Sequence, residues 1–348
     1  MEPVKDTKQP LIYRPFPAPT RTKDAGLAGS DVLTLSDFSP AEIARVLDAT
    51  AAVKTDPAKY SRTMAGKSAI MLFEKPSLRT RVTFEVGIAK LGGHAVYFDH
   101  SAQRLGERES VLDYGRNLER WVDLIIARVF SQQVLNELAT AANCPVINAL
   151  SDLHHPCQAL ADVFTLREKL GDLRKVRLAY VGDGNNVCHS LMHACALTGA
   201  SIVVVTPPDY EPMGEFVAEA RGIADTTDAT VTVTNDVGAI KGCHAVYTDV
   251  WVSMGQADMQ GKRMKAFKAY QVNADLMART GTDAYFMHCL PAHRGVEVTD
   301  DVIDSPRSIV YDEAENRMHA QNGLMTCLLS HSHETPGDAA ANWKETES

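Results

Sequence analysis

Short apolar runs alternate with longer segments of helical periodicity along most of this 348-residue chain. Strands buried on both faces give such continuous runs, and helices between them return the chain for parallel pairing. We therefore expect an α/β fold of two domains, each with a central, mainly parallel sheet flanked by helices, joined by interdomain helices. The eight clearest runs suggest two sheets of about four strands and cover residues 68–73, 95–98, 124–127, 146–150, 176–181, 202–205, 245–248 and 284–287.

The chain is longer than the roughly 250 to 300 residues at which a single core stops growing. Proline-rich residues 1–30 are expected to form an N-terminal arm, and residues 333–348 a tail. Residues 31–168 and 169–311 are the two expected domains, with the boundary at a helix predicted between His155 and Gly171. A last helix over 312–331 is expected to pack back on the first domain.

Composition narrows the class of protein. Hydrophobic residues make up 45% and charged residues 23%, which is ordinary for a soluble globular enzyme. No apolar run approaches the roughly 20 residues of a membrane span. The N-terminus has neither the layout of a secretory signal nor that of a transit peptide, so a cytoplasmic location is expected.

Charge and cysteine content exclude further classes. A net charge of −9 argues against broad nucleic-acid or anionic-membrane binding, so an anionic substrate would need a local basic pocket. The seven cysteines are an odd number without paired spacing, which indicates reduced thiols rather than a disulfide framework.

The strongest local chemistry is the segment F-E-K-P-S-L-R-T-R at 73–81, where a strand ends and a helix begins. The helix is predicted from apolar residues at helical spacing, Phe84, Ile88 and Leu91. Its start offers free N–H groups that bind phosphate. Arg79 and Arg81 would oppose the helix dipole unless an anion compensates them. The alternative is an N-cap serine, Ser77, followed by solvated arginines.

The segment H-H-P-C-Q at 154–158 precedes the predicted linking helix. His155 could polarise a carbonyl oxygen, and Gln158 could bind an adjacent amide, as an oxyanion-type site requires. A zinc site is the competitor, but a second ligand pair with matching spacing does not follow. An ordinary capped helix start is the other alternative.

In the second half, G-D-G-N-N at 182–186 follows a strand and opens a helix, where open α/β sheets place ligands. A dinucleotide loop would need a third glycine where Val187 stands. Asn185 and Asn186 could instead hold a carboxylate. Plain turn chemistry explains the segment equally well.

Two further strand ends carry reactive groups. Asp249 could bind an ammonium group, although a lone aspartate there is more often a cap. The segment H-C-L-P at 288–291 places the thiol of Cys289 at the carboxyl edge of a sheet. The thiol could take part in proton transfer there, or it could be an inert buried group. In the last helix, Arg317 could close over the pocket or pair with Glu313.

Taken together and in order, the motifs S-L-R-T-R, H-P-C-Q, G-D-G-N-N, D-V-W-V-S-M-G, H-C-L-P and E-N-R resemble the ornithine carbamoyltransferase family, over about residues 31–329. The resemblance implies transfer of the carbamoyl group from carbamoyl phosphate to the side-chain amine of L-ornithine, giving L-citrulline and phosphate in arginine metabolism. It implies a carbamoyl phosphate domain followed by an ornithine domain. It also implies a homotrimer with sites near the subunit interfaces, and no metal or organic cofactor.

The resemblance also implies a role for each matching residue. Carbamoyl phosphate would be bound by Ser77, Leu78, Arg79, Thr80, Gln103, Arg104, Arg128, His155, Pro156, Cys157, Gln158, Cys289, Leu290 and Arg317. L-Ornithine would be bound by Asn186, Asp249, Ser253 and Met254. Catalysis would depend on Arg79, Arg128, His155 and Cys289.

The chain departs from the family pattern at three places. Leu78 stands where the family often has threonine, so one hydroxyl is lost while the backbone N–H remains. Arg104 stands where many relatives have a glutamine that reaches a neighbouring subunit, and either Gln103 or Arg104 could take that role. The segment D-Y-G-R at 113–116 replaces D-T-A-R, which makes the local helix less regular.

Other functions are weighed against this one. Carbamoyltransferases that use acylated ornithines or putrescine have similar phosphate motifs, but the S-M-G loop at 253–255 favours the free amino acid. A nicotinamide dehydrogenase is disfavoured by Val187. A non-catalytic binding protein is disfavoured because the set of chemical groups looks complete.

Overall fold

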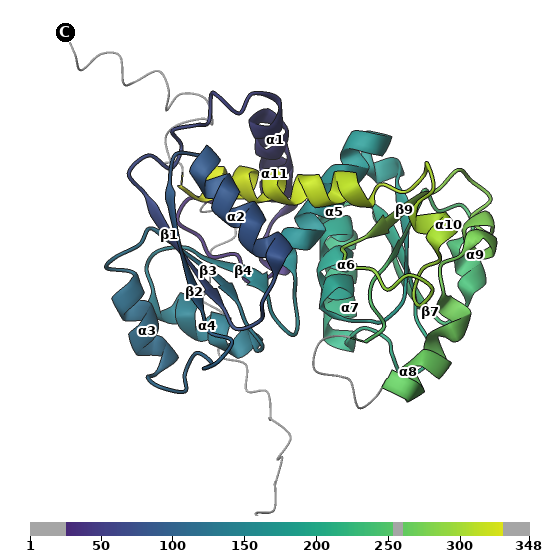
Figure 1. The fold of residues 1–348 in the computed structure, drawn as a ribbon. Coiled ribbons are helices and arrows are strands. Elements are labelled where there is room, and N and C mark those ends of the chain that lie inside the picture. Colours follow the sequence, from purple (N-terminus) through teal and green to yellow (C-terminus); the bar gives the residue numbers. More distant parts are fainter. Residues whose placement is uncertain (1–25, 253–259, 330–348) are drawn as a thin grey trace, which may run out of the picture.

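The computed structural model describes residues 26–252 and 260–329, which form two parallel sheets flanked by helices (Figure 1). The first sheet has the order β2-β1-β3-β4 and the second β7-β6-β5-β8-β9, with parallel pairing throughout. The strands are β1 (Ser68–Phe73), β2 (His94–Asp99), β3 (Leu124–Arg128), β4 (Val146–Leu150), β5 (Arg177–Val181), β6 (Ser201–Val205), β7 (Val231–Thr234), β8 (Ala245–Thr248) and β9 (Tyr285–His288). The predicted fold class is therefore confirmed.

All eight apolar runs form strands, but the expectation of about four strands in each sheet was wrong for the second sheet. The additional strand is β7, whose sequence Val-Thr-Val-Thr alternates apolar and polar residues. It lies at the edge of the sheet and is only partly buried. An edge strand needs no continuous apolar run, so the criterion that found the other strands missed it.

Helices connect the strands and cover both sheets. They are α1 (Pro40–Thr55), α2 (Leu78–Lys90), α3 (Val111–Leu118), α4 (Gln132–Ala141), α5 (Pro156–Leu170), α6 (Asn186–Thr198), α7 (Gly214–Ala224), α8 (Gln260–Phe267), α9 (Ala274–Ala278), α10 (Asp300–Ile303) and α11 (Val310–Leu329). Among the described residues, no helix combines the length and the apolar character that a membrane span requires.

Two helices connect the halves of the molecule. Helix α5 leads from the first sheet to the second and ends at Gly171, whose φ of 79° suits glycine. Helix α11 follows the last strand of the second sheet and crosses to the first half, where it packs on α1 and α2 as well as on α5 (Figure 1). One apolar cluster includes residues of both halves, such as Phe84, Phe164 and Tyr247. This shared core fixes the carboxyl ends of β1, β3, β8 and β9 relative to one another.

All seven cysteines are free thiols, as their spacing predicts. Five of them are buried, and Cys144 and Cys289 are partly buried.

Candidate active site

Helix α2 begins where the sequence predicts, with Ser77 as its N-cap. The Ser77 hydroxyl oxygen accepts a hydrogen bond from the Thr80 backbone N–H at 3.3 Å, and the hydroxyl donates to Thr80 Oγ1 at 3.0 Å. Phe84 and Ile88 are fully buried and anchor the helix. In a first helical turn, the N–H groups of Leu78 and its neighbours have no intrahelical acceptor, so they are available to an anion.

The two arginines of this turn have different surroundings. Arg81 pairs with Glu85 at 3.2 Å, and its guanidinium lies 3.8 Å from the centre of the Tyr97 ring. Arg79 is partly buried and has no carboxylate partner among the described residues. The expectation that both arginines need an anion was therefore wrong for Arg81, because Glu85 one turn later already neutralises it.

Two further arginines meet this helix start from distant parts of the chain. Arg128 at the end of β3 and Arg317 on α11 are almost fully buried, and Arg317 Nη2 donates to Thr80 Oγ1 at 3.0 Å. Neither has an ion pair with a carboxylate in the described part of the chain, and the Nε atom of each lacks a partner. Of the two roles weighed for Arg317, pairing with Glu313 is not observed.

Burial makes these two cations unfavourable. It lowers the pKa of Arg128 to about 9, with the nearby charge of Arg317 as the second cause. Burial also lowers the pKa of Arg317. Buried charges normally have partners, because desolvation of an unpaired ion costs several kcal/mol, on the order of the whole stability of a domain. The site therefore has the electrostatic character of a pocket for a strong anion.

His155 lies beside this pocket at the N-cap of α5, followed by Pro156 in the first helical position. Its imidazole Nδ1 is buried and has no hydrogen-bond partner among the residues that the structure describes, and its backbone N–H donates to Ser190 Oγ at 2.8 Å. Burial, followed by the charges of Arg317 and Arg128, holds the pKa of His155 well below its usual value. The ring is therefore neutral at neutral pH and can donate one hydrogen bond to an oxygen.

The next two residues differ in where their side chains point. Cys157 directs its Sγ to the carbonyl oxygen of Asn148 at 3.5 Å, and burial raises its pKa to about 12. Its thiol is therefore an inert packing group. Gln158 is buried, and its Nε2 donates to Asp162 and Glu313.

The loop after β2 carries Gln103 and Arg104. The Gln103 carbonyl oxygen contacts His100 Nδ1 at 3.0 Å, whereas the Arg104 guanidinium lies 4.1 Å from the centre of the Phe130 ring. Lys75 Nζ lies 4.5 Å from the same ring. Lys75 and Arg104 thus add positive charge near the anion pocket, and sequence reasoning missed Lys75 although it lies inside the phosphate motif.

Glu74 was also missed. Its carboxylate is buried and accepts the backbone N–H groups of Leu105 at 2.9 Å and Phe130 at 2.8 Å. It thereby holds together the loops that follow β2 and β3. Its position before Lys75, at the end of a strand, is the only local signal for this role.

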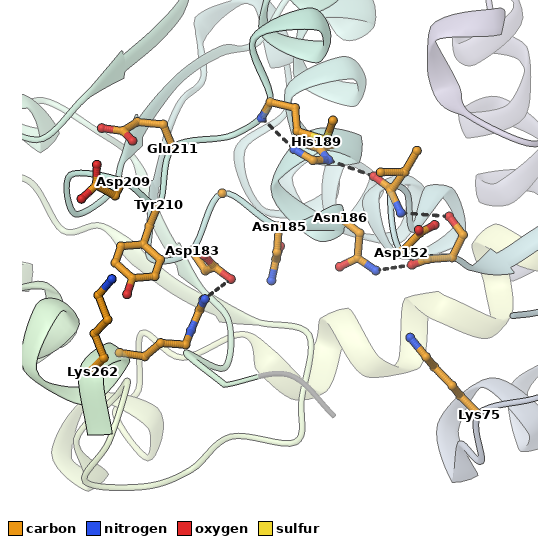
Figure 2. A pocket seen from close by; sticks show the side chains of 15 residues that line it. Lys75, Asp152, Asp183, Asn185, Asn186, His189, Asp209, Tyr210, Glu211 and Lys262 are labelled. Carbon is orange, nitrogen blue, oxygen red and sulfur yellow. Dashed lines mark hydrogen bonds and ion pairs between the residues drawn. The ribbon is translucent and has the colours of Figure 1, made fainter. Parts of the chain in front are cut away.

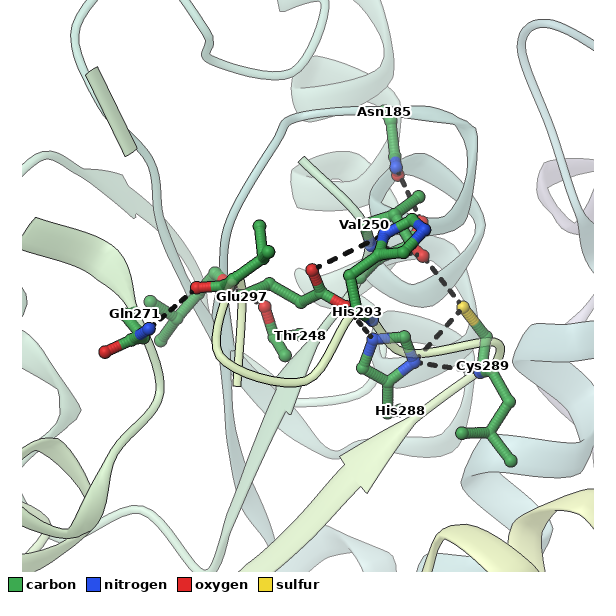
Figure 3. A network of polar contacts seen from close by, with 12 residues as sticks. Asn185, Thr248, Val250, Gln271, His288, Cys289, His293 and Glu297 are labelled. Atoms are coloured by element: carbon green, nitrogen blue, oxygen red, sulfur yellow. Dashed lines mark hydrogen bonds and ion pairs between the residues drawn. The ribbon is translucent and has the colours of Figure 1, made fainter. Parts of the chain in front are cut away.

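On the other side of the site, Asp249 follows β8 and contacts Asn185, Val250 and Cys289, which are labelled in Figure 3. Its carboxylate accepts hydrogen bonds from Asn185 Nδ2 at 2.7 Å, from the Val250 backbone N–H at 2.7 Å and from Cys289 Sγ at 3.0 Å. Burial, followed by the charge of Asp249, raises the pKa of Cys289 well above its usual value. Cys289 is therefore a thiol that donates, not a thiolate.

The network continues behind Cys289. The Leu290 backbone N–H donates to His288 Nδ1 at 2.8 Å, so His288 carries its proton on Nε2, which faces Glu297 Oε1 at 3.3 Å (Figure 3). His288 Nδ1 also lies 4.0 Å from Cys289 Sγ. Buried Glu297 is a further group that sequence reasoning missed.

Asp249, His288 and Cys289 offer three possible metal-ligand atoms within 4.8 Å of one another. However, His288 Nδ1 accepts the Leu290 N–H, and the thiol donates to Asp249. A structural zinc site takes four ligands, and the described residues offer only three here. The donor set therefore fits a hydrogen-bond network better than a metal centre.

Asn186 is the predicted ornithine contact whose side chain is engaged elsewhere. Its Nδ2 donates to the Ser151 carbonyl oxygen at 2.7 Å, and its Oδ1 accepts the Val187 backbone N–H at 2.9 Å. The predicted contacts Ser253 and Met254 lie outside the described residues.

A cleft of about 540 Å³ opens between the two halves, lined on one side by Lys75 and Asp152 and on the other by residues that include Asn185 and Asn186. Figure 2 shows Lys75 extending toward Asp152, which also belongs to the first half, and toward Asn186 of the second half. Arg263 at the far end forms an ion pair with Asp183. The cleft provides access between the cationic first half and the polar network of the second half.

Comparison with known proteins assigns the family. The model of the aspartate/ornithine carbamoyltransferase carbamoyl-P binding domain matches residues 30–168, and the model of the Asp/Orn binding domain matches residues 174–328. The ornithine carbamoyltransferase of Shewanella oneidensis is 48% identical over 298 residues, which are 86% of this chain and 99% of the relative. The chain belongs to the aspartate/ornithine carbamoyltransferase family.

Other members of the family agree. The ornithine carbamoyltransferase of Pyrococcus horikoshii is 49% identical over 306 residues, 87% of this chain and 96% of the relative. The solved structure of ornithine carbamoyltransferase from Pyrococcus furiosus matches with a TM-score of 0.85 and 47% identity, over 87% of this chain and 98% of that one. The family and the carbamoyltransferase activity predicted from the motifs are therefore confirmed.

Proposed function

We propose that this carbamoyltransferase transfers the carbamoyl group of carbamoyl phosphate to the side-chain amine of L-ornithine, giving L-citrulline and phosphate. The observation that carries the proposal is the pair of buried arginines, Arg128 and Arg317, which meet the start of α2 without carboxylate partners among the described residues. Relatives named ornithine carbamoyltransferase, at 48% and 49% identity, support the choice of acceptor.

The phosphate group binds at the start of α2. Ser77, Arg79 and Thr80, with the Leu78 backbone N–H, supply hydrogen bonds, and a doubly charged ligand offsets the cost of burying Arg128 and Arg317. Glu313, one helical turn before Arg317 on α11, accepts the His288 backbone N–H at 3.1 Å, so the anion pocket adjoins the network around Asp249.

The reaction develops negative charge at two places. The neutral amine attacks the carbamoyl carbon, the carbonyl oxygen gains charge, and the bond from that carbon to the phosphate oxygen breaks. Thr80, Arg128 and neutral His155 face the carbonyl oxygen, and Arg79 faces the leaving phosphate. Donors held in place before the reaction stabilise this charge without reorganising.

The acceptor amine must lose a proton before it attacks, because an alkylamine is protonated at neutral pH. Asp249 is the buried carboxylate that attracts the ammonium group, and Cys289 lies between it and the carbamoyl group. Asp249 and Cys289, which are hydrogen-bonded to each other at 3.0 Å, are the groups that can take up this proton. Ser253 and Met254 would complete the ornithine site.

The acceptor is tested directly. The protein is incubated with carbamoyl phosphate and, separately, with ornithine, N-acetylornithine, putrescine or aspartate, while phosphate release and carbamoylated product are measured. We expect product with ornithine and little with the other three amines. Equal or faster turnover of another amine would contradict the proposed acceptor.

We also propose a homotrimer. Leu78, Val82 and Val86 form an exposed apolar stripe along α2, and Val96 and Phe98 on the edge strand β2 are also exposed. An apolar surface of this kind on an enzyme typically marks a contact with another chain. The stripe starts at the phosphate motif, so a second copy bound there would bring Gln103 or Arg104 of one subunit near the site of the next.

The division into domains at 31–168 and 169–311, with α11 returning to the first domain, remains part of this proposal. The packing of α11 on α1 and α2 supports it. A cytoplasmic location is proposed from the seven free thiols, which a reducing compartment preserves.

A further inference from the structure

Two buried carboxyl groups lie against Gln158 and have no role in the chemistry described above. Asp162 on α5 and Glu313 on α11 are 0% and 1% exposed. Both accept hydrogen bonds from one nitrogen, Gln158 Nε2, at 2.8 Å and 2.9 Å. Glu313 also accepts the backbone N–H of His288 at 3.1 Å, directly before Cys289. The pair therefore joins the carbamoyl side of the site to the amine side.

The closeness of the two buried carboxyl groups favours a single proton shared between them. Carboxylates in contact inside a protein cannot both be ionised at low cost. Burial raises the pKa of Asp162 to about 7, and burial followed by the charge of Asp162 raises the pKa of Glu313 well above its usual value. Asp162 Oδ2 accepts no hydrogen bond of normal geometry among the described groups, and a proton on Glu313 or the nearby Tyr247 hydroxyl could supply one.

This arrangement fixes the orientation of the Gln158 amide. Both hydrogens of Nε2 are used by carboxyl oxygens, and a reversed amide would place its own oxygen against those two oxygens with one proton between them. The oxygen Oε1 must therefore face the other way. It is buried and has no donor among the described residues. A buried acceptor in this state is costly until a ligand supplies an N–H group.

We infer that Asp162 and Glu313 are positioning residues that hold Gln158 Oε1 toward the acyl donor, so that the site selects an acyl phosphate bearing an NH₂ group over one bearing a methyl group. The inference rests on the proposed function, in which His155 faces the carbamoyl oxygen, because Gln158 lies in the first turn of the helix that His155 caps. Carbamoyl and acetyl groups have nearly the same size, so shape alone separates them poorly. A hydrogen bond that only the amide can make separates them well.

The test compares three ligands by calorimetry: phosphonoacetamide, its methyl ketone analogue 2-oxopropylphosphonate, and inorganic phosphate. We expect the unchanged protein to bind the amide at least about tenfold more tightly than the ketone. Asp162→Leu should lose most of this preference while binding inorganic phosphate within about twofold of the unchanged protein. Equal weakening of all three ligands, or an unchanged preference, would overturn the inference.

A conservative variant provides the matched control. Asp162→Asn retains an oxygen that accepts from Gln158 and an N–H group in place of the shared proton, so it should keep the preference for the amide. A purely structural role for Asp162 would not predict this separation between leucine and asparagine. If thermal unfolding shows that Asp162→Leu does not fold, Glu313→Met makes the same test from the other helix.

Failure of this inference and failure of the proposed function would give different experimental results. A protein that prefers the amide but makes no citrulline would contradict the proposed reaction and leave this inference standing. A protein that makes citrulline without preferring the amide would contradict the inference alone.

Discussion

Arg79 and Arg81 are two places apart on α2, yet only one of them has an unsatisfied charge. Arg79 has no carboxylate partner among the described residues, whereas Arg81 pairs with Glu85. We predict that Arg79→Ala lowers kcat by about 10²–10³, because it removes a donor to the leaving phosphate. Arg81→Ala is the matched control and should change kcat by less than about threefold. Steady-state kinetics checks both, and near-normal turnover of Arg79→Ala would remove it from the mechanism.

The thiol of Cys289 gives a second prediction. Its Sγ donates to Asp249, the proposed ammonium site. Cys289→Ser replaces the sulfur atom with a smaller oxygen atom on a shorter bond, which alters the hydrogen bond to Asp249. The KM for ornithine should therefore rise by about tenfold, and by more than the KM for carbamoyl phosphate. Cys144→Ser, at a partly exposed position in the first half, should leave both constants unchanged. Equal rises in the two constants would argue against a role for Cys289 on the amine side.

Residues with a local motif could be predicted from the sequence, and residues joined over long distances could not. Cys289 follows an apolar run and Ser77 precedes a helical pattern, so their placement at a strand end and at a helix start could be expected. Glu313 contacts Gln158 across 155 positions, and no local pattern announces such a contact. The sequence also could not show that Asn186 is held by Ser151.

At the scale of elements, strands with continuous apolar runs were predicted within one or two residues, because burial on both faces leaves a strong signal. The exception is β2, which was expected to be buried but is an edge strand with Val96 and Phe98 exposed. The helix starts of α2 and α5 were predicted equally well, since Pro76, Ser77 and Pro156 mark them. The edge strand β7 was not predicted, because its alternating residues leave no such signal.

Two buried histidines lie where the β4–α5 loop meets α6, and they predict that the stability of the fold depends on pH. Buried His154 and His189 pack against Phe216, and burial is the main cause that lowers the pKa of His189 to about 4. Between pH 6.5 and about pH 4, the unfolded chain binds a proton there that the folded chain does not. The free energy of unfolding should therefore fall as the pH is lowered through this window, by up to about 1.4 kcal/mol per pH unit for each such histidine.

Other groups have the opposite effect on stability in this pH range. Asp183 is one of them, because burial is the main cause that raises its pKa to about 6. A comparison with His189→Gln separates the contribution of His189 from theirs. Urea unfolding of both proteins across the window should give a shallower pH dependence for the variant. Parallel curves would show that His189 does not titrate as described.

At the scale of the whole molecule, the apolar surface on α2 and β2 predicts the assembly. Leu78 and Phe98 are 78% and 49% exposed in the single chain, next to the phosphate motif. We expect sedimentation to give three times the chain mass of 38.0 kDa. Val82→Glu combined with Phe98→Glu should shift the protein toward the mass of one chain, because buried unpaired charges oppose association.

Trp121→Glu is the control for this assembly. Trp121 is 70% exposed on the first half but lies outside the surface formed by α2 and β2. The variant should retain the mass of the unchanged protein. A single-chain mass for the unchanged protein would contradict the proposed trimer, and with it the approach of Gln103 or Arg104 to the site of a neighbouring subunit.

The account depends on capture of a doubly charged acyl phosphate between the start of α2 and the two buried arginines. A crystal structure of the protein with phosphonoacetamide tests this most directly. We predict phosphonate oxygens within hydrogen-bonding distance of Arg79, Thr80 and Arg317, with the amide facing Gln158 and Cys289. A ligand bound elsewhere, with this corner of the molecule filled only by solvent, would contradict the account.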